Sequence, residues 1–222
     1  AGYIPAAKNL AINGGFDIWQ RGTTFSSPAG NTYTADRWCI QGGTGTTTHS
    51  QQITGAPLGS RYVYRIAYGA SSSYSNIQQF IETSNAAVFW GQTVTLSVKL
   101  RRNSSFAGGL TIGIDKTSTV DGGTSATWTN INSVTVANAS FPTGTTSADW
   151  YTAKVSATIP NDGTANGLRI SIFATIVGGN GEYYEISQVQ IELGSVATTF
   201  SRAGGTIQGE LSACQRYYQR KM

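Results

Sequence analysis

The sequence predicts an all-β fold, a sandwich of antiparallel strands with one short helix near its C-terminal end. Apolar and polar residues alternate along many short segments, which is the period of a half-buried strand. Gly-rich and Asp-Gly turns separate these segments at the spacing of a sandwich or barrel. The composition agrees with this, because 12% of the 222 residues are charged and 27 are glycine, which suits strands and tight turns.

The chain opens with an alternating segment, Asn9–Thr24, that we expect to be the first strand. Its apolar residues fall on even positions, namely Leu10, Ile12, Phe16 and Ile18. A similar segment covers 185–200 near the other end, and we expect the two to be neighbouring strands that close one sandwich.

The second of these segments contains an irregularity. Its apolar residues change parity between Ile186 and Val189. One extra residue in a strand causes such a change, so the sequence predicts a β-bulge at Ser187–Gln188.

The strands predicted between these ends are 61–68, 93–101, 110–114, 153–159 and 168–176, with weaker alternation at 35–40, 77–82 and 131–136. The clearest is 93–101, with apolar side chains on every second position. In 168–176, Arg169 and Phe173 fall on the polar side of the strand. His49, the single histidine, lies in a polar stretch that we expect to be a loop.

The last segment has a different period. Ile207, Leu211, Cys214 and Tyr218 recur at helical spacing, which predicts a helix from about Gln208 to Arg216. We therefore divide the chain into an N-terminal arm (1–8), the sandwich (9–203) and a C-terminal helix and tail (204–222). Leu211, Tyr217 and Tyr218 are expected to pack on the sandwich or on a neighbouring subunit.

Charge and hydropathy limit the function classes. The net charge is +4, but the basic residues form no stripe of the kind that nucleic-acid binding needs, so no such partner is expected. No apolar run reaches the 18 or so residues of a membrane span, and no basic-then-apolar leader is visible, so neither membrane insertion nor a signal peptide is expected. Cys39 and Cys214 are expected to be buried free thiols, with one disulfide as the alternative.

Catalytic chemistry has little support in the sequence. One histidine and no G-x-S-x-G motif argue against a Ser-His-Asp triad, so we expect no enzyme. Paired carboxylates remain the one route to hydrolysis. No cofactor is expected except a structural calcium ion, for which Asp17 and Glu192 on the closing strands are the candidate ligands. The alternative for these two acids is a structural pair or a hydrogen bond to Arg21.

Aromatic residues give the strongest indication of binding. The chain has 11 tyrosines, 5 tryptophans and 8 phenylalanines. Flat rings stack on the apolar faces of sugars, while amides and hydroxyls bond to the sugar rim. Trp90, Trp128, Tyr74 and Tyr183 lie in or beside polar stretches and are the candidate carbohydrate-binding residues, with core packing as the alternative for each.

Both ends of the chain resemble a domain of bacteriophage tail fibres and minor tail proteins. The similarity lies in Asn13-Gly14, Phe16, Trp19–Gly22, Asp36–Trp38, Gln190–Glu192, Gly194 and Cys214–Tyr218. This resemblance implies a jelly-roll domain like those of carbohydrate-binding modules, placed on a virion fibre and usually trimeric. It supplies no sugar-binding residue, because the matched positions are typical of strand framework, with Arg21 and Asp36-Arg37 as a polar cluster.

Together these features predict a non-catalytic virion domain on the surface of a phage particle. Its expected partners are a host-surface glycan, other virion proteins and two further copies in a homotrimer. The alternative is a structural virion protein without glycan binding, such as a capsid decoration, head fibre or tail-assembly protein. A polysaccharide depolymerase is the third hypothesis.

Overall fold

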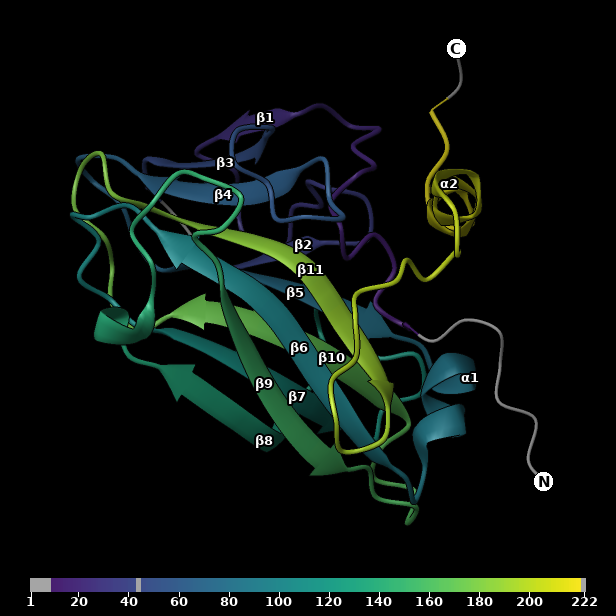
Figure 1. Ribbon diagram of the computed structural model, residues 1–222. Coiled ribbons are helices and arrows are strands. Elements are labelled where there is room, and N and C mark those ends of the chain that lie inside the picture. The colour runs from purple at the N-terminus through teal and green to yellow at the C-terminus, as the bar shows by residue number, and fades with distance from the viewer. Residues whose placement is uncertain (1–8, 43–44, 221–222) are drawn as a thin grey trace.

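The computed structural model describes residues 9–42 and 45–220, which form two antiparallel sheets packed face to face (Figure 1). The six-stranded sheet has the order β1 (Thr24–Ser26), β3 (Thr47–Gln52), β4 (Val63–Tyr68), β11 (Tyr183–Leu193), β6 (Thr93–Arg102), β9 (Tyr151–Thr158). The five-stranded sheet has the order β2 (Cys39–Gly42), β5 (Ser75–Ile81), β10 (Gly167–Ala174), β7 (Leu110–Thr117), β8 (Thr129–Val136). The predicted antiparallel jelly-roll β-sandwich is confirmed.

Helices are few and short. They are α1 (Thr83–Ala86), the 3-10 turns η1 (Ala87–Phe89) and η2 (Asn138–Ser140), and α2 (Ile207–Gln215). None of the helices in the described part of the chain has the length and apolar content of a membrane crossing. The predicted arm, 1–8, lies outside the described residues.

The core lies between the two sheets and follows the alternation in the sequence. On β6 the inward side chains, Val94, Leu96, Val98 and Leu100, are fully buried, and the inward residues of β10 meet them from the other sheet. Full burial of each such side chain contributes about 1.5–3 kcal/mol. The intervening residues of these strands point outward, so each sheet has an outer face.

The first predicted strand is wrong in conformation but right in position. Residues 9–20 form a loop, in which Asn13 and Phe16 have positive φ values of 57° and 55°. The loop lies against β11, with Leu10 N donating to Ile191 O at 3.1 Å and Val189 N donating to Gly14 O at 2.9 Å. The two distant segments therefore close one sandwich, as expected, although only one of them is a strand.

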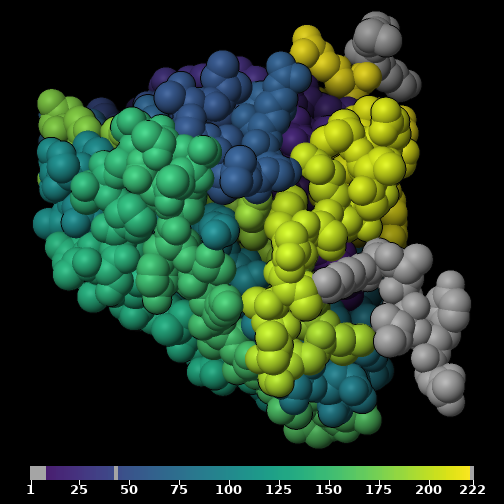
Figure 2. Space-filling model, viewed as in Figure 1, coloured from purple at the N-terminus to yellow at the C-terminus, as the bar shows by residue number. Residues whose placement is uncertain are grey.

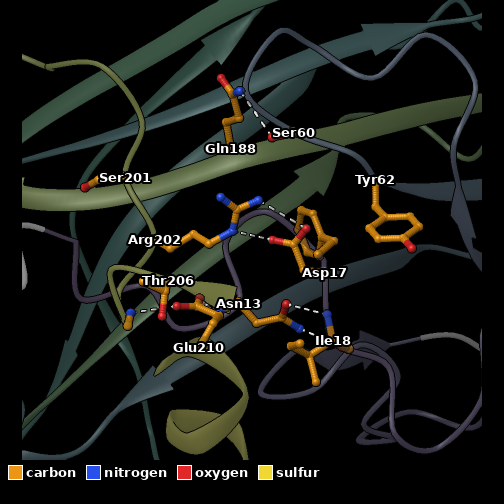
Figure 3. Close-up of polar contacts among 12 residues, drawn as sticks. Asn13, Asp17, Ile18, Ser60, Tyr62, Gln188, Ser201, Arg202, Thr206 and Glu210 are labelled. Atoms are coloured by element: carbon orange, nitrogen blue, oxygen red, sulfur yellow. Dashed lines mark hydrogen bonds and ion pairs between the residues drawn. The ribbon is translucent and has the colours of Figure 1, made fainter. Parts of the chain in front are cut away.

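The Asn13 side chain explains why this segment turns. Its Oδ1 accepts from Ile18 N at 3.0 Å, and its Nδ2 donates to Ile18 O at 2.8 Å (Figure 3). Asparagine tolerates the left-handed region and bonds to nearby backbone, so it favours this loop over an extended strand. Gly14 is needed beside it, because a Cβ there would lie 2.0 Å from Val189 O.

The predicted bulge in the last strand is confirmed. The pairing of β11 with β6 shifts register between Ser187 and Gln190, and Gln188 has a φ of 50°. The extra residue turns the Gln188 side chain towards the loop between β3 and β4, where Nε2 donates to Leu58 O at 2.7 Å.

The prediction that His49 lies in a loop is wrong, since it is a fully buried residue of β3. Its Nδ1 lies 2.8 Å from Tyr64 Oη and its Nε2 lies 2.6 Å from Ser75 Oγ. These hydrogen bonds, one of which joins the two sheets, compensate for burying the polar imidazole of His49. The stretch around His49 is polar throughout, so the alternation of apolar residues did not predict β3. Burial lowers the pKa of His49 to about 3, so the ring is neutral.

The C-terminal helix is confirmed, with α2 displaced by one residue from the predicted bounds. The Thr206 side chain caps it by accepting from Gly209 N at 3.1 Å. The helix lies outside the two sheets (Figure 1). Buried Glu210 joins it to the loop, because its carboxylate accepts from Asn13 N and from Gly204 N.

The tail after α2 packs on its own sandwich. The guanidinium carbon of Arg37 lies 3.5 Å from the ring centroid of Tyr217, and that of Arg21 lies 3.6 Å from that of Tyr218. In this single chain both tyrosines contact the sandwich, and Leu211 of α2 is half-buried. Packing of these residues on a neighbouring subunit stays a prediction. The trimer stays a prediction.

Both cysteines are buried free thiols, as predicted. Burial raises the pKa of Cys39 to about 11 and raises that of Cys214 as well, so neither is a thiolate at neutral pH.

Candidate functional site

The outer face of the five-stranded sheet carries amides and aromatic rings. Asn76 and Gln78 alternate along β5 with buried Ile77, and Arg169 and Phe173 occupy the outward positions of β10. Two hollows of about 260 and 590 Å³ lie on this face and share Gln41 and Arg169 as lining residues. They therefore form one groove across the strands, which we define by Gln41, Asn76, Gln78, Trp128, Asn130, Arg169 and Phe173.

Trp128 forms a braced aromatic surface at the smaller hollow. Its ring stacks on Phe80, with centroids 5.5 Å apart and planes inclined by 26°. Its Nε1 donates to Gly123 O at 3.1 Å, and the guanidinium carbon of Arg169 lies 5.2 Å from the ring centroid. The ring is half-buried and fixed on several sides, so a ligand would lose little entropy in ordering it.

An ion pair anchors the floor where the hollows meet. Arg169 Nε donates to Asp115 Oδ2 at 2.9 Å, and Arg169 Nη1 donates to Gln78 Oε1 at 3.2 Å. Asn130 Nδ2 donates to Asp115 Oδ1 at 2.9 Å. The charges compensate each other, so the groove presents directed hydrogen-bonding groups without a net charge.

Two amides of the groove have unused capacity. Asn76 Oδ1 is buried and has no hydrogen-bond partner in the structure. The Gln41 side chain makes no hydrogen bond to any described residue. Because buried polar groups are normally hydrogen-bonded, these amides are available to a ligand that offers hydroxyl groups.

The four predicted aromatic residues do not come together. Trp128 lines the groove, but Tyr74, which is 52% exposed, precedes β5 and is not among the lining residues. Tyr183 begins β11 in the other sheet, and its ring centroid lies 4.0 Å from the guanidinium carbon of Arg65. Trp90 lies outside the groove, where it is half-buried against the core and its Nε1 donates to Ala165 O at 2.8 Å.

The groove residues that sequence reasoning missed are Gln41, Asn76, Gln78 and Asn130. Each occupies the outward phase of a strand or a strand end, where a polar residue is expected for solubility alone. The one available signal was Phe173 on the polar side of its strand, in phase with Arg169.

The candidate calcium ligands lie in separate polar contacts. Asp17 pairs with Arg202, Oδ2 to Nε at 2.8 Å (Figure 3), while Arg21 pairs with Asp36 at 3.2 Å. Glu192 accepts from Thr198 N at 2.8 Å. In the described ranges no group of three or more His, Cys, Asp or Glu side chains could hold a metal ion. The calcium site stays a prediction.

Comparison with known proteins relates the fold to sugar-binding modules. No protein-family model matches the chain, and no curated protein matches it. Among solved structures, it is similar to a C-terminal family 22 carbohydrate-binding module of Clostridium thermocellum, with a TM-score of 0.50 and 10% identity, over 88% of this chain and 100% of that one.

Two further structures are similar at TM-scores below that value. A xylan-binding domain from Paenibacillus barcinonensis has a TM-score of 0.47 and 15% identity, over 78% of this chain and 94% of the other. The enzymatically active domain of a tailspike protein from bacteriophage CBA120 has a TM-score of 0.47 and 15% identity, over 77% of this chain and 21% of that one. At 10% identity, the likeness to the family 22 module shows a common β-sandwich fold alone.

Proposed function

We propose that this protein is a non-catalytic virion domain that binds host-surface glycan through the groove on the five-stranded sheet. The observation that carries the proposal is the groove itself, in which a braced indole lies beside amides that lack partners. The similarity of the fold to carbohydrate-binding modules supports it.

The chemistry of a sugar matches this surface. A pyranose has an apolar C–H face that can lie on Trp128 and a rim of hydroxyls that donate and accept at once. Gln41 and Asn76 offer amides, which also donate and accept, and Asn130 offers its amide oxygen as an acceptor. An anion or a cation would instead meet the compensated pair of Arg169 and Asp115. The groove crosses several strands, so an extended oligosaccharide fits it better than a single sugar.

The carboxylates support binding over hydrolysis. Glycosidases use two carboxyl groups on either side of the scissile bond. Among the described residues that line the groove, Asp115 is the single acid, and its carboxylate is held by Arg169 and Asn130. A depolymerase mechanism has no second carboxylate here.

The phage setting rests on the resemblance of both chain ends to tail-fibre and minor tail-protein domains. Such a domain would stand in three copies on the particle surface, next to other virion proteins. Each site would bind weakly, and multivalent display would raise the avidity by about 10²–10⁴.

The test is a glycan array probed with a trimer-displayed form of the protein, followed by titration of the best oligosaccharide with the monomeric form. Trp128→Ala should weaken binding about tenfold, which corresponds to about 1.4 kcal/mol. Trp90→Phe, outside the groove, is the control and should bind as the parent does. If the folded, multivalent protein binds no host polysaccharide, the alternative of a structural virion protein without glycan binding is favoured.

A further inference from the structure

A second pocket lies on the opposite side of the sandwich, on the outer face of the six-stranded sheet. Figure 2 shows this face hollowed between the segments near residues 57, 148 and 199, drawn in blue, green and yellow-green. The pocket has a volume of about 470 Å³. Pockets for small ligands usually measure roughly 300–1,000 Å³.

Two lysines stand on the floor of this pocket. Ser97 of β6 pairs in register with Lys154 of β9, and Lys99 pairs with Thr152, so the lysines are diagonal neighbours on one face. Neither lysine makes an ion pair or a side-chain hydrogen bond to any residue that the structure describes. We call the site lined by Ser97, Lys99, Trp150, Thr152, Lys154 and Phe200 the lysine pocket.

The acids near the lysine pocket are already engaged. Glu185 lies between Arg101 and Arg65, with Oε1 2.7 Å from Arg65 Nη2. Asp149 Oδ2 accepts from Thr146 N at 2.7 Å, and Glu192 is buried and accepts from both Thr198 groups. The two lysine charges are therefore left for a ligand from outside, and like charges this close favour an anion between them.

Arg101 fixes two walls of the pocket. This residue is 1% exposed, and its guanidinium donates to the carbonyl oxygens of Thr54 and Gly55 at 2.8 Å and of Thr146 at 3.0 Å. Trp150 adds a bond from Nε1 to Gly55 O at 2.9 Å. The loops that carry Leu58 and Ala148 are thus anchored to the sheet before any ligand arrives.

Outward amides of β11 hold the remaining walls. Gln188, turned by the bulge, bonds to Leu58 O, and Gln190 Oε1 accepts from Ser201 N at 2.8 Å. The segment that ends at Phe200 is held against the sheet in this way. A pre-formed pocket costs less ordering entropy on binding than a mobile one.

We infer that the lysine pocket binds a carboxylate-bearing sugar, a uronate residue of an acidic oligosaccharide. The carboxylate would lie between Lys99 and Lys154 in charge-assisted hydrogen bonds. Ser97 and Thr152 offer hydroxyls to the ring substituents, and Trp150 and Phe200 give the apolar C–H face its contact. This site is on the other sheet from the groove, so it stands whether or not the groove binds neutral glycan.

The test follows backbone amide shifts by NMR during titration with trigalacturonate and with its carboxyl-reduced counterpart, which carries CH₂OH in place of each carboxylate. Trigalacturonate should shift the amides of Ser97, Lys99, Thr152 and Lys154 and saturate, whereas the reduced sugar should not. The double variant Lys99→Gln/Lys154→Gln should weaken trigalacturonate binding at least tenfold, and added salt should weaken parental binding.

Two matched variants separate charge from fold. Lys99→Arg/Lys154→Arg keeps both charges and should retain most of the affinity, and Lys116→Gln removes a lysine of β7 and should change nothing. Trp128→Ala should leave these shifts intact, so failure of the groove and failure of the lysine pocket are distinguishable. Three outcomes would overturn the inference. The Gln double variant could bind trigalacturonate as tightly as the parent does, inorganic phosphate could bind the parent as tightly as trigalacturonate does, or the amide shifts could map to the groove.

Discussion

The outer faces of the two sheets differ in chemistry although the same alternation produces both. The groove on the five-stranded sheet has a compensated ion pair, open amides and a stacked indole. The lysine pocket on the six-stranded sheet has two cations that pair with no acid in the described part of the chain, and its walls are made by loops. The groove is built mostly by side chains of the strands, with Trp128 just before β8, while the lysine pocket depends on loops that buried polar groups hold in place.

That difference predicts the largest effect for Arg101, since it holds two walls of the lysine pocket. Arg101→Met leaves Glu185 buried with one cationic partner fewer, so the free energy of unfolding should fall by about 3–5 kcal/mol. Urea denaturation measures this. Arg216→Met is the control, because its pair with Glu82 is 60% exposed on the arginine side and should contribute about 0–1 kcal/mol. If both variants lose a similar amount of unfolding free energy, the buried ion pair of Arg101 contributes no more than the exposed pair of Arg216.

The loop beside β11 should be the next most sensitive place. Gly14→Ala puts a Cβ 2.0 Å from Val189 O, and the resulting shift should lower the free energy of unfolding by about 3 kcal/mol. Gly123→Ala, where a Cβ meets nothing within 4 Å, should cost less than about 0.5 kcal/mol. Thermal and urea denaturation measure this. If both variants have a free energy of unfolding close to that of the parent, the contact between the loop and β11 contributes little to stability.

His49 connects the two sheets and should make stability depend on pH. Its pKa is 6.5 when unfolded and about 3 when folded, so below pH 6.5 the unfolded state binds the proton and the native state does not. Stability is therefore complete above pH 6.5 and is lost as the pH falls towards 3. Between pH 6.5 and 5 the loss should be about 2 kcal/mol, from about 1.4 kcal/mol per unit.

Urea titrations of the parent and of His49→Gln at both pH values check this, since the chain has a single histidine. The slope should disappear in the variant. Glu210, whose pKa burial raises, has the opposite sign and cannot mimic it. If the free energy of unfolding of His49→Gln changes with pH as much as that of the parent, other titrating groups cause the effect.

The smallest stability effect belongs to the groove, where function and stability should separate. Asn76→Ala removes a buried acceptor without a partner, so the free energy of unfolding should stay equal or rise by up to about 1 kcal/mol. Glycan binding at the groove should weaken at the same time. Gln52→Ala, on β3 of the other sheet, is the comparison for a polar strand residue with no part in the groove. A destabilised Asn76→Ala would mean that this amide serves the fold.

Local pattern was sufficient for most of the fold. Strands such as β6 and β10 follow from period-two alternation, α2 follows from helical spacing, and the bulge near Gln188 follows from one parity change. These are properties of neighbouring residues, so they need no knowledge of the partner strand. Pattern failed for 9–20 and for β3. Asn13 bonds to the backbone of its own turn, and His49 bonds to the side-chain hydroxyls of Tyr64 and Ser75, which are distant in the sequence.

The sequence by itself determined the sandwich, its bulge, its terminal helix and the polar phase of the strands that alternate clearly, such as β6 and β10, because all of these depend on residue periodicity. Only the tertiary structure decided which outward residues share a surface, since strand order brings β2, β5, β10, β7 and β8 together from distant parts of the chain. It also decided that Trp128 lines a groove while Trp90, which is equally half-buried, packs against the core elsewhere. The burial of an aromatic ring depends on the segments that pack over it, and these segments are distant in the sequence.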